Sequence, residues 1–262
     1  MIEKPALRVA DLFCGPGGLS EGMRLGGCKI VYGLDKAKDA VTTFQANQPD
    51  AIAVVGDATE LNVEDMPEFD VLVGGPPCVN FSQSKGGRAN ILEGLRLVQM
   101  FLRVVFERKP KYWIMENVPR IALHLPDEIP LKWLGIEKDG VLPVPVRHEF
   151  NCADYGVPQN RKRYLIGNYP IPEPTHEKSE ESPLFESVSE RKPWRNLSKV
   201  LDALGQPYQQ QASEIEDPNY GFQINSSALA DHYHEVDLAD REVESIRAVK
   251  TEHPYMGYMP FP

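Results

Sequence analysis

The sequence is short of cysteine and has no long apolar run. Four cysteines occur in 262 residues, with no CxxC pair among them, which argues against both a disulfide framework and a zinc site and favours reduced thiols. The most apolar stretches are only a handful of residues long, far below the roughly 20 needed to span a bilayer, and residues 1–10 lack the apolar core of a signal peptide. We therefore expect a cytoplasmic protein with no membrane partner.

Positive charge is scarce as well. The chain has 28 Lys and Arg against 38 Asp and Glu, a formal net charge of -10. Binding to a phosphate backbone normally needs a concentrated basic surface, so the overall charge argues against a nucleic-acid partner unless basic patches are local. Many of the acids fall in polar runs such as residues 177–182, which leaves room for such patches. The 42% of hydrophobic residues suffices for a large core.

Strand-like and helix-like stretches alternate through the first half of the chain. The strands are expected at residues 7–13, 29–35, 51–57, 69–75 and 112–118, and the helices at 19–25, 37–45 and 92–107. Such alternation implies a parallel sheet with crossover helices. The sequence thus predicts an α/β protein with a mostly parallel, twisted sheet and helices on both faces.

The pattern changes after this region. Residues 147–152 and 163–169 resemble two further strands, joined by a turn at residues 156–158. From residue 170 the chain is first rich in proline and then charged and rich in serine, with only short helices expected at 197–204 and 238–249. We expect a catalytic α/β domain over residues 1–172, followed by a separate segment over 173–262.

A glycine-rich turn follows the first expected strand, in the stretch ADLFCGPGGLS. Gly15, Gly17 and Gly18 stand at a strand–helix junction, where absent side chains let a ligand approach the backbone and the helix N-terminus. The second strand ends in Asp35, where a ribose would be bound, and the third in Asp57, near an adenine amino group. Together they suggest an adenosine-type cofactor, although both acids would also serve as caps of the following helices.

The fourth and fifth strands end in GGPPC and MENVP. Glu116 closes an apolar strand and should be partly buried with a raised pKa, as a proton donor at neutral pH requires. Cys78 would face it as a thiolate. Buried cysteines are usually inert, but the prolines before Cys78, the polar loop after it and the neighbouring Glu116 favour a nucleophile.

A third set of polar residues occurs in DYGVPQNRKRYLIG. Arg161 and Arg163 point to one side of an extended chain and Lys162 to the other. Either arginine, or both, would orient Glu116 or hold an anionic or carbonyl group. The alternative is a solvated basic strand end.

Taken together, DLFCGPGGLS, GGPPC, MENV and QNRKR resemble the DNA (cytosine-5) methyltransferase family over residues 7–169. The resemblance implies a Rossmann-like methyltransferase fold, S-adenosylmethionine as cofactor with S-adenosylhomocysteine as product, double-stranded DNA as substrate and a place in restriction-modification. It implies Cys78 as nucleophile, Glu116 as the acid at the base's N3, and Arg163 at the base carbonyl, with Arg161 beside it. The implied cofactor contacts are Phe13, Gly15, Gly17, Gly18, Leu19, Asp35, Asp57, Ala58, Pro76 and Leu97.

The sequence departs from the family pattern in three places. Val79 follows the cysteine where the family often has Gln, and Asp35 stands where Glu is common. The target-recognition region and the last two motifs are not found; residues 231–250 resemble the segment that leads into that region. We therefore expect a second polypeptide, or a longer version of this chain, to carry recognition and most phosphate contacts.

Other interpretations stay open. The core motifs alone do not separate a DNA from an RNA cytosine methyltransferase, and a noncatalytic regulatory subunit would keep the same fold. The intact set of Cys78, Glu116 and Arg163 argues against the last of these. His232 and His234 are the one pair that suggests a metal, but a surface turn accounts for them better, so we expect no metal.

Overall fold

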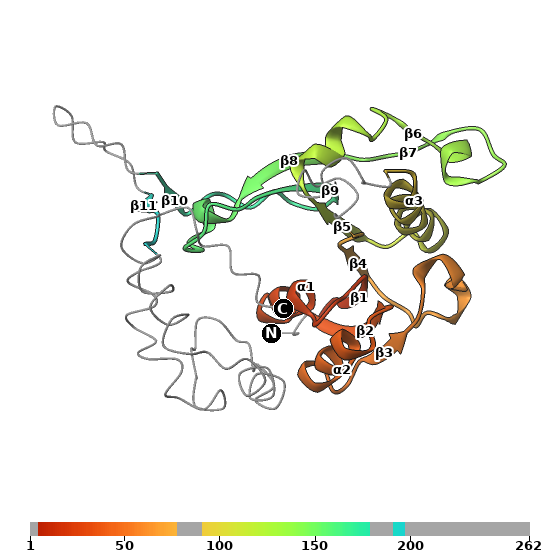
Figure 1. The fold of residues 1–262 in the computed structure, drawn as a ribbon, viewed down its shortest axis with the longest axis horizontal. Helices are drawn as coiled ribbons and strands as arrows, with labels where there is room; N and C mark the ends of the chain where they lie inside the picture. Colours follow the sequence, from red (N-terminus) through yellow and green to blue (C-terminus); the bar gives the residue numbers. More distant parts are fainter. Residues whose placement is uncertain (1–4, 78–90, 179–190, 197–262) are drawn as a thin grey trace, which may run out of the picture. The chain divides into compact units, whose positions relative to one another are not determined.

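The structure, a computed structural model, describes residues 5–77, 91–178 and 191–196 (Figure 1). The chain forms two compact units. The first comprises Met1–Phe150 and Lys162–Pro172, and the second Asn151–Arg161 and Glu173–Pro262. Residues 151–161 thus belong to the second unit, and the division of the chain after residue 172 stays a prediction.

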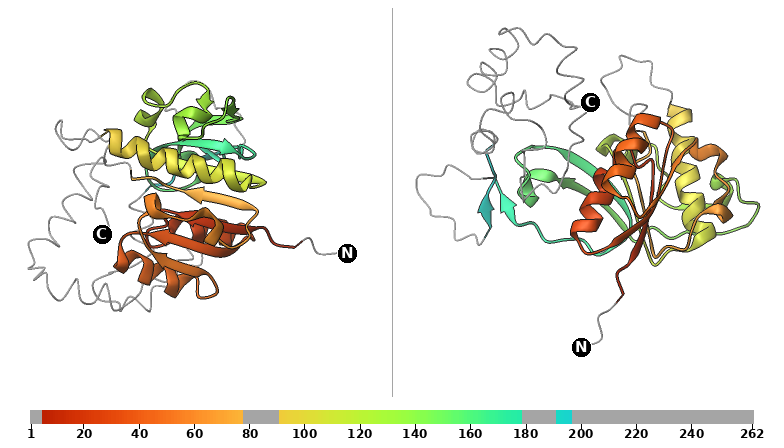
Figure 2. Two further views of the ribbon diagram at one scale, coloured as in Figure 1. Left: turned by 90° about the vertical axis from the view of Figure 1, so that its right-hand side faces the viewer. Right: turned by 90° about the horizontal axis from the view of Figure 1, so that it is seen from below.

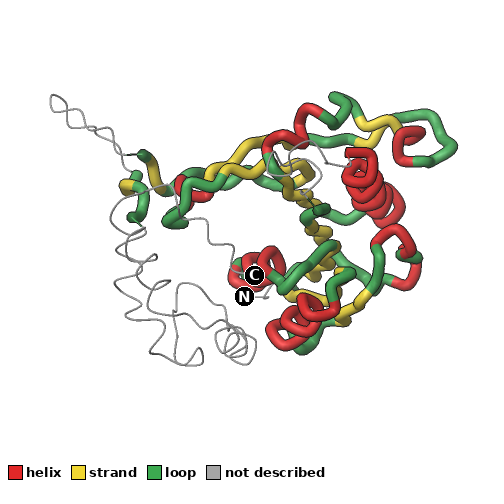
Figure 3. The backbone as a smooth tube through the Cα atoms, viewed as in Figure 1, coloured by secondary structure: helices red, strands yellow, loops and turns green. Residues whose placement is uncertain are grey.

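The first unit is built on a seven-stranded sheet with the order β3-β2-β1-β4-β5-β9-β8. The strands are β1 Arg8–Leu12, β2 Lys29–Asp35, β3 Ile52–Val55, β4 Val71–Gly74, β5 Tyr112–Asn117, β8 Val146–Asn151 and β9 Lys162–Asn168. The strands from β1 to β5 pair in parallel, whereas β9 runs antiparallel to β5. The predicted mostly parallel α/β fold is confirmed, and Figure 3 shows its alternating strands and helices.

Helices cover both faces of this sheet (Figure 2). The helices are α1 Gly18–Leu25, α2 Lys38–Asn47 and α3 Ile91–Arg108. Alternate residues of β4 divide between the faces: Leu72 joins a core cluster with α3, while Val71 and Val73 join one with Phe44 of α2. This period of two is what a strand buried on both faces requires.

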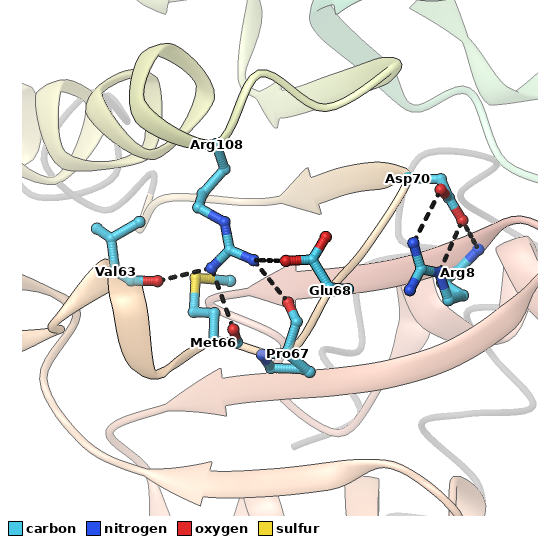
Figure 4. Close-up of polar contacts among 7 residues, drawn as sticks. All are labelled: Arg8, Val63, Met66, Pro67, Glu68, Asp70 and Arg108. Atoms are coloured by element: carbon cyan, nitrogen blue, oxygen red, sulfur yellow. Dashed lines mark hydrogen bonds and ion pairs between the residues drawn. The ribbon is translucent and has the colours of Figure 1, made fainter.

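Two arginines form hydrogen bonds between segments that are far apart in the sequence (Figure 4). Arg8 donates from Nε and Nη2 to the two carboxylate oxygens of Asp70, at 3.0 and 3.2 Å, which ties β1 to the start of β4. At the end of α3, Arg108 donates to three carbonyl oxygens of the connection between β3 and β4, those of Val63, Met66 and Pro67, at 2.7, 3.1 and 3.0 Å. The Arg108 bonds give these carbonyl oxygens a donor, although Val63 O also accepts from Met66 N at 3.3 Å.

A small antiparallel sheet completes the first unit, formed by β6 Ile129–Pro130 and β7 Val141–Leu142. Its residues Ile129 and Leu142 join the core cluster on the α3 side. No helix within the described ranges is long and apolar enough to cross a bilayer.

The second unit is described over short stretches. Its strands β10 His176–Glu177 and β11 Lys192–Pro193 pair in parallel, and Trp194 Nε1 donates to Asp154 at 2.9 Å. Gly156 adopts φ +84 and lies against the His176 ring, with 2.7 Å from a notional Cβ to Cε1, so a side chain would not fit there. The helices expected at 197–204 and 238–249 lie outside the described residues.

Candidate active site

The predicted site residues of the first unit gather at one edge of the sheet. Strands β1 to β5 are parallel, so the turns that follow them meet at their carboxyl ends. The order of the strands reverses between β1 and β4, and in open α/β sheets ligands bind in the crevice at such a point. Backbone hydrogen bonds join neighbouring turns: Cys14 N donates to Leu34 O at 3.1 Å, and Gly56 N to Asp35 O at 2.9 Å.

The glycine turn has the conformation that its sequence predicts. Gly15 and Gly17 have φ +52 and +100, and Phe13 has φ 61, a region that costs little only for glycine. Gly17 is the N-cap of α1 without a side-chain cap bond, and a notional Cβ at Gly18 meets nothing within 4 Å. The space beside Gly18, at the start of α1, is therefore open, which suits a polar ligand near the helix N-terminus.

Asp35 ends β2 as predicted, whereas Asp57 lies two residues beyond the end of β3 at Val55. Asp35 accepts from the N–H of Gly15 at 3.0 Å and from that of Ala37 at 2.8 Å. Asp57 accepts from Thr59 N and Oγ1, both at 2.8 Å, and these bonds lower the pKa of its carboxyl. Asp57 is therefore the N-cap of the short helix Ala58–Glu60, whereas the N-cap of α2 is Ala37, without a side-chain cap bond. The capping interpretation is seen for Asp57 and not for Asp35. A carboxylate has about four lone-pair sites, so a ribose or adenine contact adds to these bonds and stays a prediction.

The remaining predicted cofactor residues are the apolar ones. Ala58 and Pro76 are buried, whereas Leu19 and Leu97 are partly buried, on α1 and α3 respectively. Pro76 lies in the turn after β4. Leu19, Ala58 and Pro76 lie in segments at the carboxyl edge of the sheet. Leu97 lies further along its helix, in the second turn of α3.

An ion pair stands at the end of β5. Glu116 lies opposite Leu165 of β9, which brings Arg163 of β9 to it, with 2.6 Å between Arg163 Nε and Glu116 Oε1. The side chain of Glu116 is 27% exposed and that of Arg163 is 15% exposed. Limited access to water makes such a pair stronger than one on the surface. The predicted partial burial of Glu116 is confirmed, and of the two arginines Arg163 is the one that contacts it.

Arg161 and Cys78 are the other two predicted catalytic residues. Arg161 belongs to the second unit, where its carbonyl oxygen accepts from Cys152 N at 2.9 Å. Lys162 turns away from Arg163, as its alternation predicts, and pairs with Glu149 at 2.9 Å. Cys78 lies outside the described residues, directly after Pro77 in the sequence, so its role as nucleophile stays a prediction.

Two buried polar residues at this edge of the sheet, Asp11 and Asn117, were not predicted from the sequence. Asp11 is fully buried and accepts from Ser20 Oγ of α1 at 2.7 Å, and burial raises the pKa of Asp11 to about 7. Asn117 is also fully buried, and its Nδ2 donates to Pro76 O at 3.0 Å. The signal for each in the sequence is a polar residue within an otherwise apolar strand.

Burial also raises the pKa of the Cys14 thiol, which makes this thiol inert.

The sheet order, the glycine turn, the strand-end acids and the Glu116–Arg163 pair define a Rossmann-like protein of the methyltransferase class. The chain belongs to the C-5 cytosine-specific DNA methylase family, whose model matches residues 7–258. The resemblance inferred from the four motifs is thereby confirmed.

Individual relatives agree with this assignment. The chain is 29% identical over 224 residues to the Type II methyltransferase M.AquIA of Picosynechococcus, covering 75% of this chain and 88% of that one. It is 33% identical over 189 residues to M.NgoFVII of Neisseria gonorrhoeae, covering 68% and 50%. A crystal structure of a prophage-encoded DNA modification methyltransferase from Escherichia coli matches with a TM-score of 0.49 and 30% identity over 62% of this chain and 46% of that one. The match thus spans about half the length of several relatives.

Proposed function

We propose that this chain is the catalytic part of a DNA (cytosine-5) methyltransferase, which transfers a methyl group from S-adenosylmethionine to C5 of a cytosine. The observation that carries the proposal is the Glu116–Arg163 pair, held at 2.6 Å at the carboxyl edge of the sheet. Family membership over residues 7–258 supports it. Restriction-modification is the setting that the Type II names of the relatives suggest.

The proposed chemistry assigns each reactive side chain a step. The Cys78 thiolate adds to C6 of the cytosine while Glu116 supplies a proton to N3, which makes C5 nucleophilic. S-adenosylmethionine, when bound, supplies the methyl group as an electrophilic sulfonium. After transfer, the C5 proton leaves and Cys78 is expelled from C6. The cytosine must leave the duplex to reach these groups. Arg163 holds the Glu116 carboxylate in place and contacts the base carbonyl.

The cofactor site proposed here lies between the glycine turn and the two strand-end acids. The bare N-terminus of α1 and the open space beside Gly18 suit a small polar group, and the carboxylate of Asp35 suits a ribose hydroxyl pair. Asp57 and Pro76 lie at the same carboxyl edge of the sheet, after β3 and β4. The first step of the proposal is therefore testable as cofactor binding alone, without DNA.

Replacing Asp35 with alanine is expected to weaken S-adenosylmethionine binding by about 1.5 to 3 kcal/mol, the range for a hydrogen bond involving a charged group. Calorimetric titration measures this. Asp39→Ala is the matched control, because Asp39 is an exposed acid in the first turn of the neighbouring α2. Equal affinities for the two variants would leave Asp35 with its two backbone hydrogen bonds as its only role.

The whole function is tested by incorporation of a tritiated methyl group into nucleic acid. The purified chain, in micromolar excess and at low salt, is incubated with labelled cofactor and either unmethylated duplex DNA or RNA, and the product is digested to nucleosides. We expect 5-methylcytosine in DNA. Label in RNA would favour the RNA enzyme, and cofactor binding without incorporation into either would favour a noncatalytic subunit.

The second polypeptide remains a prediction, motivated by the net charge of -10. At nanomolar concentration and ordinary salt, we expect the 262-residue chain alone to bind DNA weakly and to methylate it little or not at all, because few cations are available for phosphate contacts. Adding the complementary polypeptide should restore sequence-specific methylation. Gel-shift and methylation assays of the chain alone measure this, and robust, sequence-specific methylation there would contradict it.

A further inference from the structure

The turn after β4 and the end of β5 are joined by one buried side chain. The last paired residues of the two strands include Gly74 and Met115, so the next residues along each strand are Gly75 and Glu116, and then Pro76 and Asn117. Asn117 is fully buried. Its Nδ2 donates to Pro76 O at 3.0 Å, and its Oδ1 accepts from Val118 N at 2.9 Å. The Asn117 amide thus donates to the turn after β4 and accepts from the residue that follows β5.

The sequence of the turn explains why a side chain is needed there. A proline has no N–H, so neither Pro76 nor Pro77 can donate to β5 and extend the ladder beyond Gly74. The regular ladder therefore stops at Gly74, and the Pro76 carbonyl needs a donor from outside it, because an unpaired buried carbonyl is costly. The Asn117 amide supplies, from a side chain, the bond that the backbone cannot make.

The same turn also touches the Glu116 carboxylate. A notional Cβ at Gly75 would stand 3.2 Å from Glu116 Oε2, closer than nearly all such contacts. The other oxygen, Oε1, is held by Arg163 at 2.6 Å. The carboxylate therefore lies between a guanidinium and the backbone of the turn, and a small displacement of the turn changes the space available to it.

We propose that Asn117 is a positioning residue, which holds the Gly75–Pro77 turn against β5 and thereby sets where this turn lies relative to the Glu116 carboxylate. The inference rests on the proposed methyl transfer. Asn117 itself touches no reacting atom in this account. Its effect should therefore fall mainly on the rate of the chemical step, with a smaller loss of cofactor affinity, because Pro76 of the same turn is a predicted cofactor contact.

The test measures single-turnover methyl transfer per folded protein, with chain in excess over duplex DNA at low salt. Asn117→Ala is expected to lower the rate about 100-fold, the loss that a misplacement near 1 Å can cause, while the dissociation constant of S-adenosylmethionine rises by less than about tenfold. Val105→Ala is the control, because it truncates a buried side chain of α3 away from the turn. Its thermal stability should fall, but its rate per folded protein should stay near wild type.

Asn117→Asp separates positioning from loss of stability. Burial raises the pKa of a carboxyl, and only the neutral acid can donate to Pro76 O while accepting from Val118 N. The rate of this variant relative to wild type should therefore rise as pH is lowered from 8 to 6, by up to about tenfold per pH unit. Dividing by the wild-type rate removes the pH dependence that the two proteins share.

Two results would overturn the inference. One is a rate for Asn117→Ala within threefold of wild type after correction for unfolded protein. The other is a flat ratio for Asn117→Asp across the pH range. If the wild-type chain shows no transfer at all, the proposed function fails first, and this inference fails with it.

Discussion

Cys78→Ser is expected to lower the methyl-transfer rate by at least about 10⁴-fold, the scale of loss seen when an attacking side chain is removed from an enzyme. A serine hydroxyl supplies almost no anion near neutral pH, whereas a thiol supplies some and is intrinsically more nucleophilic. The measurement is single-turnover transfer to duplex DNA. S-adenosylmethionine affinity and thermal stability should stay close to wild type, because the substitution exchanges one atom.

Cys28→Ser is the matched control for this experiment. Cys28 lies between α1 and β2, is partly buried, and belongs to no proposed site. Its rate should stay within about threefold of wild type. A duplex containing 5-fluorocytosine should form a covalent adduct with the wild-type chain and with Cys28→Ser but not with Cys78→Ser. Transfer by Cys78→Ser at a rate near wild type would assign the nucleophile to another residue.

The parts of the fold that sequence predicts well are those that local patterns determine. The five strands of the parallel sheet and the three helices were expected from apolar runs and turn residues, and each is present within a few residues. The expected strand at 51–57 is shorter, at Ile52–Val55, because Gly56 and Asp57 already belong to the following turn. The glycine turn was predictable for the same reason: its φ values are demands on single residues.

Contacts between distant segments were less accessible. Arg8 and Asp70 are 62 positions apart, and their pairing depends on β1 lying beside β4. Sequence spacing left Arg161 and Arg163 as equal candidates for Glu116. The register of β9 on β5 decided between them, since it places Glu116 opposite Leu165 and so within reach of Arg163.

Asn117 shows the same limit inside a recognised motif. It belongs to the MENV stretch, yet nothing in that stretch indicates that its amide would donate to Pro76, 41 positions earlier. That bond follows from the parallel register of β4 and β5 together with two prolines that cannot donate. Asp35 and Asp57 pose the opposite difficulty, because each carboxylate already accepts backbone N–H bonds and is also a proposed ligand contact.

Glu116→Gln should lower the transfer rate by about 10² to 10⁴-fold, the usual contribution of general acid–base catalysis. The amide keeps the shape of the side chain, but it cannot deliver a proton to N3, and it loses the charge that Arg163 pairs with at 2.6 Å. Glu149→Gln is the control, since Glu149 forms an exposed pair with Lys162 on the neighbouring strand, and such surface pairs contribute about 0 to 1 kcal/mol. Single-turnover rates at saturating cofactor separate the two. Since the amide leaves cofactor affinity untouched in this account, unchanged turnover in Glu116→Gln would remove Glu116 from the mechanism and leave its pair with Arg163 as a structural contact.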